Sequence, residues 1–238
     1  MKEIYDKYLS ILRAFVQKSA PPLLDTAELK EILNLAYINS TSAMVSYVYL
    51  SHPELIDNAS FPDLRTQCFQ SIALYAKRAD KMKTLLKELN QNGIDCILFK
   101  GFIVKEFYPI PELRTFGDID FVIREADRKK CDALMKQLGY EPKANWEPVF
   151  SYLKGIEYYE IHTNIMDIDV SDKANYVSYF GHMWEYIQPS ETVALPHVFE
   201  FSPEFHFLYL LTHIAKHISN SGAGIRMYLD IALFVQHY

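Results

Sequence analysis

Residues 94–123, IDCILFKGFIVKEFYPIPELRTFGDIDFVI, contain two short apolar runs separated by a proline-bearing loop. The runs IDCILF and IDFVI have the length of buried strands. The second run begins inside an Asp-x-Asp pair, Asp118 and Asp120. Because successive side chains of a strand point to opposite faces, both carboxylates are expected on one face, with Ile119 in the core.

Two carboxylates that point the same way repel each other, and a divalent cation relieves that repulsion. Hard oxygen ligands of this kind suit Mg²⁺, which also carries substrate phosphates. The pair therefore favours a phosphoryl- or nucleotidyl-transfer site. Two structural alternatives stay open: a solvated strand edge, and an ion pair of Arg114 with either aspartate that needs no metal.

A family resemblance is carried by Lys100-Gly101 after the first run, by Arg114 in the loop, and by Gly117-Asp118-Ile119-Asp120 on the second run. This arrangement resembles the core of the polymerase-β-like nucleotidyltransferase superfamily. It is most similar to a bacterial branch described as uncharacterised nucleotidyltransferases and, more distantly, to abortive-infection nucleotidyltransferase toxins. The likeness covers about residues 94–165.

One position departs from the superfamily. The usual Gly-Ser or Gly-Gly is Gly101-Phe102 here, so a hydroxyl that often helps to hold the triphosphate is missing. Lys100 and backbone N–H groups at the start of the following helix would have to replace it. This departure leaves open a second class of function, a module that binds Mg-NTP without turnover.

The expected fold class is α+β, with a small mixed nucleotidyltransferase sheet flanked by helical N- and C-terminal regions. The expected division is a helical region at 1–92, the nucleotidyltransferase core at 93–170 and a mostly helical region at 171–238. A capping-box pattern, Asp25 with Glu28, starts one of the early helices. The missing cap at Tyr238 leaves open that the natural chain continues.

Within the core, periodicity predicts strands at 94–99 and 119–123. A short helix is expected at 101–108 and a longer one at 125–138. A hairpin is expected with arms at 146–153 and 156–165. A further strand pair is expected within 193–201, around Pro196. A helix is expected to begin at Ser202-Pro203.

The second hairpin arm supplies a candidate for a third carboxylate. Alternation places Glu160 and His162 on one face of the strand. In the family that this core resembles, an acidic residue followed two places later by His is a recurring form, and the carboxylate completes the metal site. Asp167 and Asp169 form a second Asp-x-Asp and are the rival candidates, although Asp is also common in turns.

The resemblance implies transfer of a nucleoside monophosphate from a nucleoside triphosphate, such as ATP, to an acceptor hydroxyl. Two Mg²⁺ ions, with Mn²⁺ as an alternative, would assist attack on the α-phosphate. The catalytic and metal-binding residues would be Asp118, Asp120 and Glu160. The nucleotide-binding residues would be Lys100, Gly101, Arg114, Gly117 and His162, with Lys100 and Arg114 on the β- and γ-phosphates and His162 positioning the acceptor.

The last helical region carries His206, His213 and His217. The last two are four residues apart, a spacing seen in zinc sites. The metalloprotease form needs Glu directly after the first His, where this chain has Ile214, so a structural role or a polar contact at the edge of the nucleotide pocket is favoured. The segment around Asp230 resembles a Leu-Asp-Ile-Ala element of the same family and suggests no chemistry by itself.

Composition limits the partners. The net charge of −6 argues against bulk nucleic-acid binding, so a small-molecule, protein or tRNA acceptor is expected. No apolar run is long enough for a membrane span, and the N-terminus does not have the pattern of a signal peptide. Three widely spaced cysteines fit reduced thiols in the cytoplasm. A helical partner-binding protein without nucleotide chemistry is the remaining alternative.

Overall fold

The computed structural model describes residues 2–56, 60–115, 117–146, 148–165, 176–220 and 222–238. The chain forms two compact units, each assembled from distant segments. Unit 1 comprises Met1–Lys77, Lys105–Phe116 and Ala223–Leu233, and unit 2 comprises Arg78–Val104, Gly117–Gly222 and Phe234–Tyr238. The expected regions 1–92, 93–170 and 171–238 therefore follow the order of elements along the chain, whereas the compact units draw on several regions at once.

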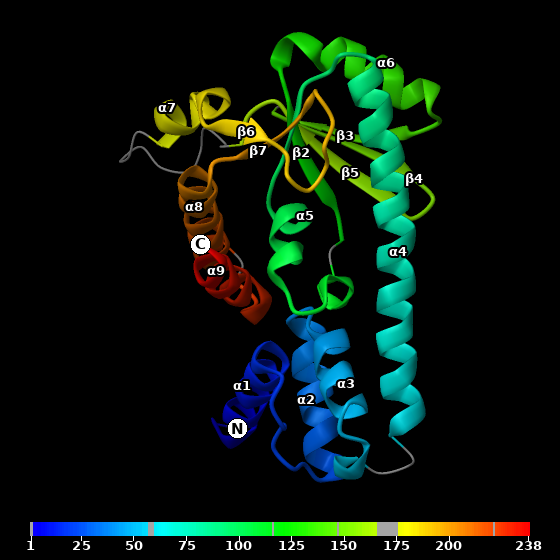
Figure 1. Cartoon of the computed structure of the whole chain (residues 1–238), viewed down its shortest axis with the longest axis vertical. Helices are drawn as coiled ribbons and strands as arrows, with labels where there is room; N and C mark the ends of the chain where they lie inside the picture. The colour runs from blue at the N-terminus through cyan, green and yellow to red at the C-terminus, as the bar shows by residue number, and fades with distance from the viewer. Residues whose placement is uncertain (1, 57–59, 116, 147, 166–175, 221) are drawn as a thin grey trace. The chain divides into compact units, whose positions relative to one another are not determined.

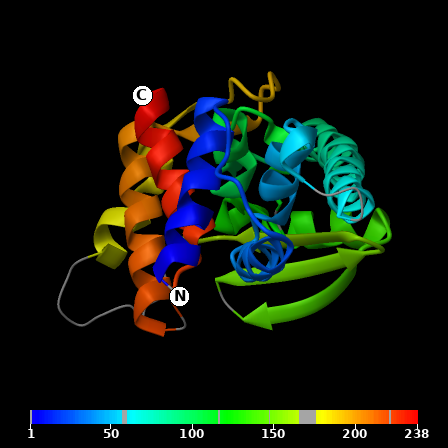
Figure 2. The same cartoon turned by 90° about the horizontal axis from the view of Figure 1, so that it is seen from below.

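Unit 1 is helical. Its elements are α1 (Lys2–Gln17), α2 (Thr26–Ile38), α3 (Ser42–Leu50), the 3₁₀ turn η1 (Pro53–Leu55), the first part of α4 (Phe61–Gln91), the turns η2 (Lys105–Phe107) and η3 (Pro111–Leu113), and most of α9 (Ile225–His237). The helices α1, α2 and α3 pack against one another and lie close together in Figure 2.

Local chemistry explains where the early helices begin. The Asp25 side chain accepts a hydrogen bond from the Glu28 N–H, and the Glu28 carboxylate accepts one from the Asp25 N–H, which completes the predicted capping box. The same Glu28 also pairs with Lys7 of α1. Ile11 and Ile32, on α1 and α2, are fully buried. Apolar burial therefore holds this helical group together, and the capping box fixes the start of α2.

Unit 2 contains the sheet. Its elements are the rest of α4, β1 (Cys96–Leu98), α5 (Gly101–Val104), β2 (Ile119–Ile123), η4 (Glu125–Asp127), α6 (Arg128–Gln137), β3 (Glu141–Trp146), β4 (Val149–Lys154), β5 (Glu157–His162), α7 (Tyr176–Gly181), η6 (Met183–Glu185), β6 (Ile187–Pro189), β7 (Val198–Phe201) and α8 (Pro203–Asn220).

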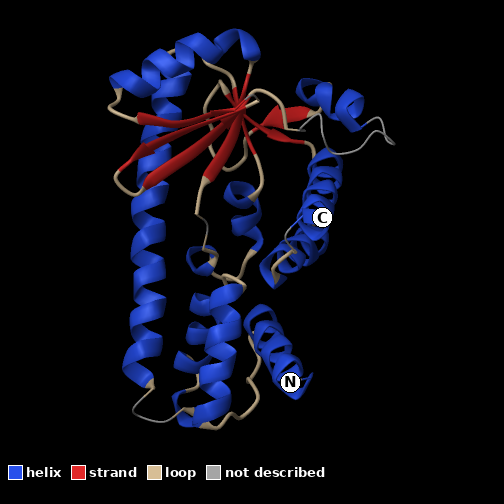
Figure 3. Cartoon of the chain, turned by 180° about the vertical axis from the view of Figure 1, so that it is seen from behind, coloured by secondary structure: helices blue, strands red, loops and turns tan. Residues whose placement is uncertain are grey.

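The seven strands lie in the order β3-β4-β5-β2-β1-β7-β6, and Figure 3 shows them as one twisted sheet. The central pair β1 and β2 is antiparallel, whereas β2 with β5 and β1 with β7 are parallel. All five residues of β2 are buried, as expected for a central strand covered on both faces. The predicted α+β class with a small mixed sheet and helical flanks is confirmed.

Two strands differ from the sequence-based expectations. No strand was expected at β3, which contains Pro142, a residue without a backbone donor. The structure accommodates it at the edge of the sheet, where the pairing of β3 with β4 shifts between Pro142 and Ala144. An edge strand tolerates proline because one side of its backbone needs no ladder partner.

The second difference concerns the strand pair expected within 193–201. Its later strand, β7, is present, but its partner is β6 at Ile187–Pro189, outside the expected range. The connection between them is held by the buried Glu200 carboxylate, which accepts hydrogen bonds from the Ser190 hydroxyl and, at 3.0 Å, from the Thr192 N–H. A side chain therefore replaces the short turn that the sequence pattern favoured.

Among the described residues, none of the helices, marked in Figure 1, combines the length and the apolar character needed to cross a bilayer.

Candidate active site

The centre of the candidate site is formed by two neighbouring parallel strands. In the β2–β5 pairing, Asp120 lies directly beside Glu160. Because paired residues of a parallel sheet share a face, both carboxyl groups project from the same side, as alternation predicted. His162 lies two residues further along β5 on that face, and its Nε2 atom is 2.9 Å from Asp120 Oδ1. One potential ligand atom from each of these three residues lies within 4.8 Å of the others.

Lys100 brings a cation to this carboxylate. It follows β1, and its Nζ atom donates a hydrogen bond to Asp120 Oδ1 over 2.7 Å. The Lys100 backbone has a φ of 51°, in the left-handed region that a non-glycine residue seldom adopts. Its N–H donates to Nε2 of the buried His206 on α8 over 3.0 Å. Lys100 is thus held at its backbone and at the end of its side chain.

Burial and neighbouring charges give the two carboxyl groups opposite properties. Burial, followed by the charges of Asp120 and Asp118, raises the pKa of Glu160 to about 7. Burial also acts to raise the pKa of Asp120, but Lys100 and His162 outweigh it and hold that pKa below its ordinary value. Asp120 is therefore the fixed anion of the site, and Glu160 is the carboxyl group whose charge is opposed by its neighbours.

The surroundings of His162 disfavour the charged form of its imidazole. Burial lowers its pKa, although its hydrogen bond to Asp120 opposes that shift. The ring packs edge-on against Phe99, with 5.5 Å between ring centroids. The sequence analysis expected His162 to position the acceptor, and the structure places it beside the central aspartate.

The other members of the Gly-Asp-x-Asp motif lie at the start of β2. Asp118 and Gly117 are exposed, and the charge of Asp118 still acts on Glu160. Among the described residues, the close three-ligand group consists of Asp120, Glu160 and His162 and does not include Asp118. The structure thus brings one expected metal ligand into the group from each strand and leaves Asp118 at its solvent side.

Gly101 begins α5, which is only four residues long. Phe102, which occupies the position of the superfamily's serine, is buried with 6% of its surface exposed. Its side chain belongs to the apolar interior and contributes no polar atom to the site.

Arg114 lies elsewhere, in unit 1. Its Nε and Nη2 atoms donate to the two carboxylate oxygens of Asp230 over 2.8 and 2.6 Å, and Tyr108 donates its hydroxyl to the same carboxylate over 2.5 Å. Arg114 is 3% exposed and Asp230 6%. The expected contact of Arg114 with phosphates stays a prediction.

Sequence reasoning missed two features of these networks. His206 was noticed only as part of a histidine-bearing helix, and its contact with Lys100 joins segments 106 positions apart. Asp230 was noticed only within a family-like segment, and its partner Arg114 is 116 positions away. Both residues are buried polar groups flanked by apolar residues, which is a sequence signal for a required partner but not for its identity.

The alternative metal ligands fare differently. Asp167 and Asp169 lie outside the described residues. The rings of His213 and His217 meet edge-on with 4.7 Å between centroids, but among the described residues they belong to no group of three potential metal ligands. Burial, together with the nearby charge of Lys100, lowers the pKa of His213 to about 3, so this ring is neutral.

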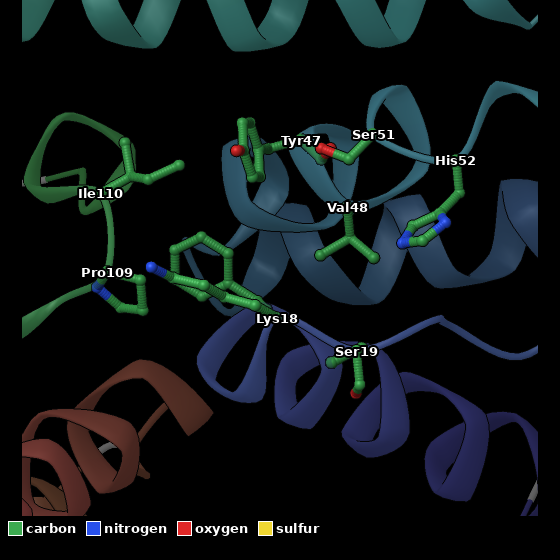
Figure 4. Close-up of a pocket in the computed structure, with 10 residues that line it drawn as sticks. Lys18, Ser19, Tyr47, Val48, Ser51, His52, Pro109 and Ile110 are labelled. Carbon is green, nitrogen blue, oxygen red and sulfur yellow. The ribbon is translucent and has the colours of Figure 1, made fainter.

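A pocket of about 260 Å³ lies in unit 1. It lies between α1, α3 and the segment that carries Pro109 and Ile110, and Figure 4 shows Val48 and Lys18 among its lining residues. The pocket contains none of the residues that the motif analysis selected.

The mixed sheet, with a lysine after β1 and carboxylates on β2 and β5, defines the class as nucleotidyltransferase. The chain belongs to the family described as uncharacterised nucleotidyltransferase, which matches residues 25–238. The resemblance inferred from Lys100-Gly101 and the Gly-Asp-x-Asp segment is confirmed. Among curated proteins, none matches this chain in sequence.

A solved structure agrees in fold, and a second one was also matched. The antibiotic-resistance factor ANT(2'')-Ia, studied in solution, superposes with a TM-score of 0.52 at 12% identity over 68% of this chain and 85% of that chain. The lincosamide antibiotic adenylyltransferase LnuA with lincomycin bound gives a TM-score of 0.47 at 17% identity, covering 67% of this chain and 97% of that chain. At these identities the likeness concerns the fold alone.

The donor set fits a hard divalent cation. Asp120 and Glu160 offer oxygen ligands on adjacent strands, and Asp118 offers another at the solvent side. Burial is the main cause of the raised pKa of Glu160, and the charges of Asp120 and Asp118 raise it further while Lys100 opposes them. His162 would be an unusual direct ligand for Mg²⁺ and suits a hydrogen bond to the ligating carboxylate better.

Proposed function

We propose that this protein transfers a nucleoside monophosphate from a nucleoside triphosphate to an acceptor hydroxyl, assisted by Mg²⁺. The observation that carries the proposal is the meeting of Asp120, Glu160 and His162 on two parallel strands, with the Lys100 ammonium 2.7 Å from Asp120. In this reaction the acceptor oxygen forms a bond to the α-phosphorus, the bond to the β-phosphate oxygen breaks, and pyrophosphate leaves.

The metal would be held by Asp118, Asp120 and Glu160 in a two-metal site, where it would neutralise phosphate charge and lower the pKa of the attacking hydroxyl. Lys100 binds the β- and γ-phosphates through its ammonium group. Glu160 orients the attacking hydroxyl, and its carboxylate accepts the proton that this hydroxyl loses as the bond to phosphorus forms. His162 keeps the Asp120 carboxylate in one orientation through its hydrogen bond.

The acceptor is proposed as a hydroxyl-bearing small molecule, with protein and tRNA acceptors as alternatives. Support comes from the net charge of −6, which disfavours a polyanionic partner. The neighbour LnuA was solved with lincomycin, and another structure of ANT(2'')-Ia holds adenylyl-2''-tobramycin. Such antibiotics are reasonable members of an acceptor panel, although likeness in fold does not identify the acceptor.

The test is to incubate the protein with each of the four NTPs, labelled at the α-phosphate, together with Mg²⁺ and an acceptor panel. Label transferred to an acceptor, together with released pyrophosphate, is the expected result. An Asp120→Asn variant should release none. Tight Mg-NTP binding without pyrophosphate release across all three acceptor classes would instead favour the non-catalytic binding module, which the buried Phe102 at the serine position makes a specific alternative.

A further inference from the structure

The strained residue of the candidate site is Lys100. Its φ of 51° is costly for a side chain with a Cβ atom, so the surrounding structure must hold it there. The carbonyl of Lys100 accepts hydrogen bonds from the N–H groups of Ile103 and Val104, at 3.2 and 3.0 Å. These contacts fix the chain on the C-terminal side of Lys100.

The N-terminal side of Lys100 is held by an imidazole. The Lys100 N–H donates to His206 Nε2 over 3.0 Å, and His206 is only 2% exposed. The ring lies between aromatic neighbours, with centroids 6.2 Å from Phe201 and 5.3 Å from Phe234. Rotation of the imidazole is restricted by this packing, so its acceptor nitrogen has a fixed direction.

This hydrogen bond also affects where the Lys100 ammonium lies relative to Asp120. Lys100 Nζ is 2.7 Å from Asp120 Oδ1, so the residue whose backbone His206 holds is the residue whose ammonium contacts the central aspartate. Without His206, the partly buried Lys100 N–H would lose its acceptor, and the left-handed conformation would lose one of its restraints. The ammonium would then sample positions away from Asp120.

We propose that His206 is a positioning residue of the site: it keeps Lys100 in the left-handed conformation and so places the Lys100 ammonium for binding the triphosphate. The part of this inference that concerns the triphosphate rests on the proposed function. The part that concerns the hydrogen bond does not. This assignment gives a role to the first histidine of α8, which the sequence analysis had noted without assigning it a function.

The first experiment needs no nucleotide. An imidazole that accepts at Nε2 must carry its proton on Nδ1, which is the less common tautomer of neutral histidine. Nitrogen-15 NMR of the imidazoles in the whole protein at pH 7.5 is expected to show His206 in the Nδ1–H form. The Lys100 amide should also be protected from hydrogen exchange. A protonated His206, or an Nε2–H tautomer, would overturn the proposal because neither can accept the hydrogen bond.

The second experiment compares three variants. His206→Phe keeps an aromatic ring without an acceptor, His206→Gln keeps an oxygen acceptor, and His182→Phe is the control at an exposed histidine of the same unit. We expect His206→Phe to remove exchange protection of the Lys100 amide and to weaken Mg-NTP binding by about tenfold, as expected for the loss of a partly buried hydrogen bond. His206→Gln should recover part of both, and His182→Phe should change neither.

The third experiment asks whether His206 acts through the Lys100 ammonium. In a Lys100→Met background, which lacks that ammonium, His206→Phe should weaken Mg-NTP binding less than twofold further. An equal, additive loss in both backgrounds would overturn the positioning role. If the parent protein binds no NTP at all, the proposed function fails, while the tautomer and exchange results still decide the structural half of the inference.

Discussion

Each compact unit contains an ion pair between a basic side chain and a buried aspartate. The charges around the two pairs differ in sign. In unit 1, Asp230 accepts two hydrogen bonds from Arg114 and one from Tyr108. Nη1 of Arg226 lies 3.6 Å from Oδ2 of the same carboxylate. In unit 2, Asp120 accepts a hydrogen bond from Lys100 and contacts His162. Two further carboxyl groups are close, Glu160 beside Asp120 and Asp118 nearby. The first carboxylate is surrounded by donors, whereas the second belongs to a group with excess negative charge.

This difference separates a structural ion pair from a candidate cation site. A carboxylate whose neighbours all donate hydrogen bonds has no electrostatic reason to recruit a metal. A cluster that keeps excess negative charge after its lysine is counted does have such a reason. Ion pairing alone therefore does not identify the site; the charge of the neighbouring residues does.

The largest expected effect comes from removing one partner of the unit 1 pair. Asp230→Asn leaves the Arg114 guanidinium buried without its counter-charge, so we expect a loss of about 3–5 kcal/mol in the free energy of unfolding. Metal-free Asp120→Asn should cost clearly less, because Glu160 and Asp118 still offset the charge of Lys100. Urea titration by circular dichroism measures both.

The control for that pair of measurements is Asp6→Asn on the exposed face of α1, expected within about 0.5 kcal/mol of the parent protein. If metal-free Asp120→Asn loses as much stability as Asp230→Asn, the two pairs are alike. Asp120 would then be part of a structural ion pair, and the metal-site interpretation would fail.

A second prediction concerns Glu160 and separates chemistry from binding. A residue that acts on the attacking oxygen matters more to transfer than to nucleotide affinity. Glu160→Gln should reduce the transfer rate by at least roughly a hundredfold, or about 2.7 kcal/mol in activation free energy, and keep Mg-NTP affinity within about tenfold. Single-turnover transfer assays and isothermal titration calorimetry provide the two readouts.

The rivals of Glu160 are its controls. Asp167→Asn and Asp169→Asn should leave both transfer and Mg-NTP affinity near the values of the parent protein. Loss of transfer in either variant, while Glu160→Gln stays active, would show that Glu160 is not the third carboxylate.

Metal linkage is the third way to separate the two aspartates. A ligand present at a hundred times its dissociation constant stabilises the folded state by about 2.7 kcal/mol. Saturating Mg²⁺ should therefore raise the free energy of unfolding of the parent protein and of Asp6→Asn to a similar extent. Asp120→Asn should lose that increment. An Mg²⁺ increment that persists in Asp120→Asn would place the cation elsewhere.

A smaller effect tests how far the charge of Lys100 extends. Burial, then Lys100 and His217, lower the pKa of His213 to about 3, with Asp120 opposing them and Lys216 adding slightly. Because the unfolded chain binds this proton more tightly, the stability contributed by neutral His213 is complete above pH 6.5 and is lost as the pH falls toward 3. Between pH 7.5 and 5, the loss amounts to about 2 kcal/mol.

The measurement compares urea unfolding at these two pH values. His213→Gln should lose less stability on acidification than the parent protein, whereas the exposed His182→Gln should behave like the parent. In Lys100→Met the acid sensitivity should decrease, because one positive neighbour of His213 is gone. Equal acid sensitivity in the parent protein and His213→Gln would show that His213 titrates normally.

Local pattern was sufficient for several elements. Alternation along 156–165 placed Glu160 and His162 on one face, and the capping box at Asp25 and the helix after Ser202 follow from short-range chemistry. The strand β3 and the partner of β7 were not predictable in this way. Each depends on pairing with a distant strand or on a side-chain contact such as that of Glu200, and neither leaves a local periodic signal.

The sequence by itself determined the family, the fold class and the residues that could carry the chemistry. Strand alternation acts over a few residues and grouped Asp118 with Asp120 and Glu160 with His162, whereas the roles of Lys100 and Glu160 came from the family resemblance. Only the tertiary structure decided which charges meet. Arg114, four positions before Asp118, pairs with Asp230, and His206 holds Lys100 from 106 positions away, because buried polar groups find partners through the packing of distant segments.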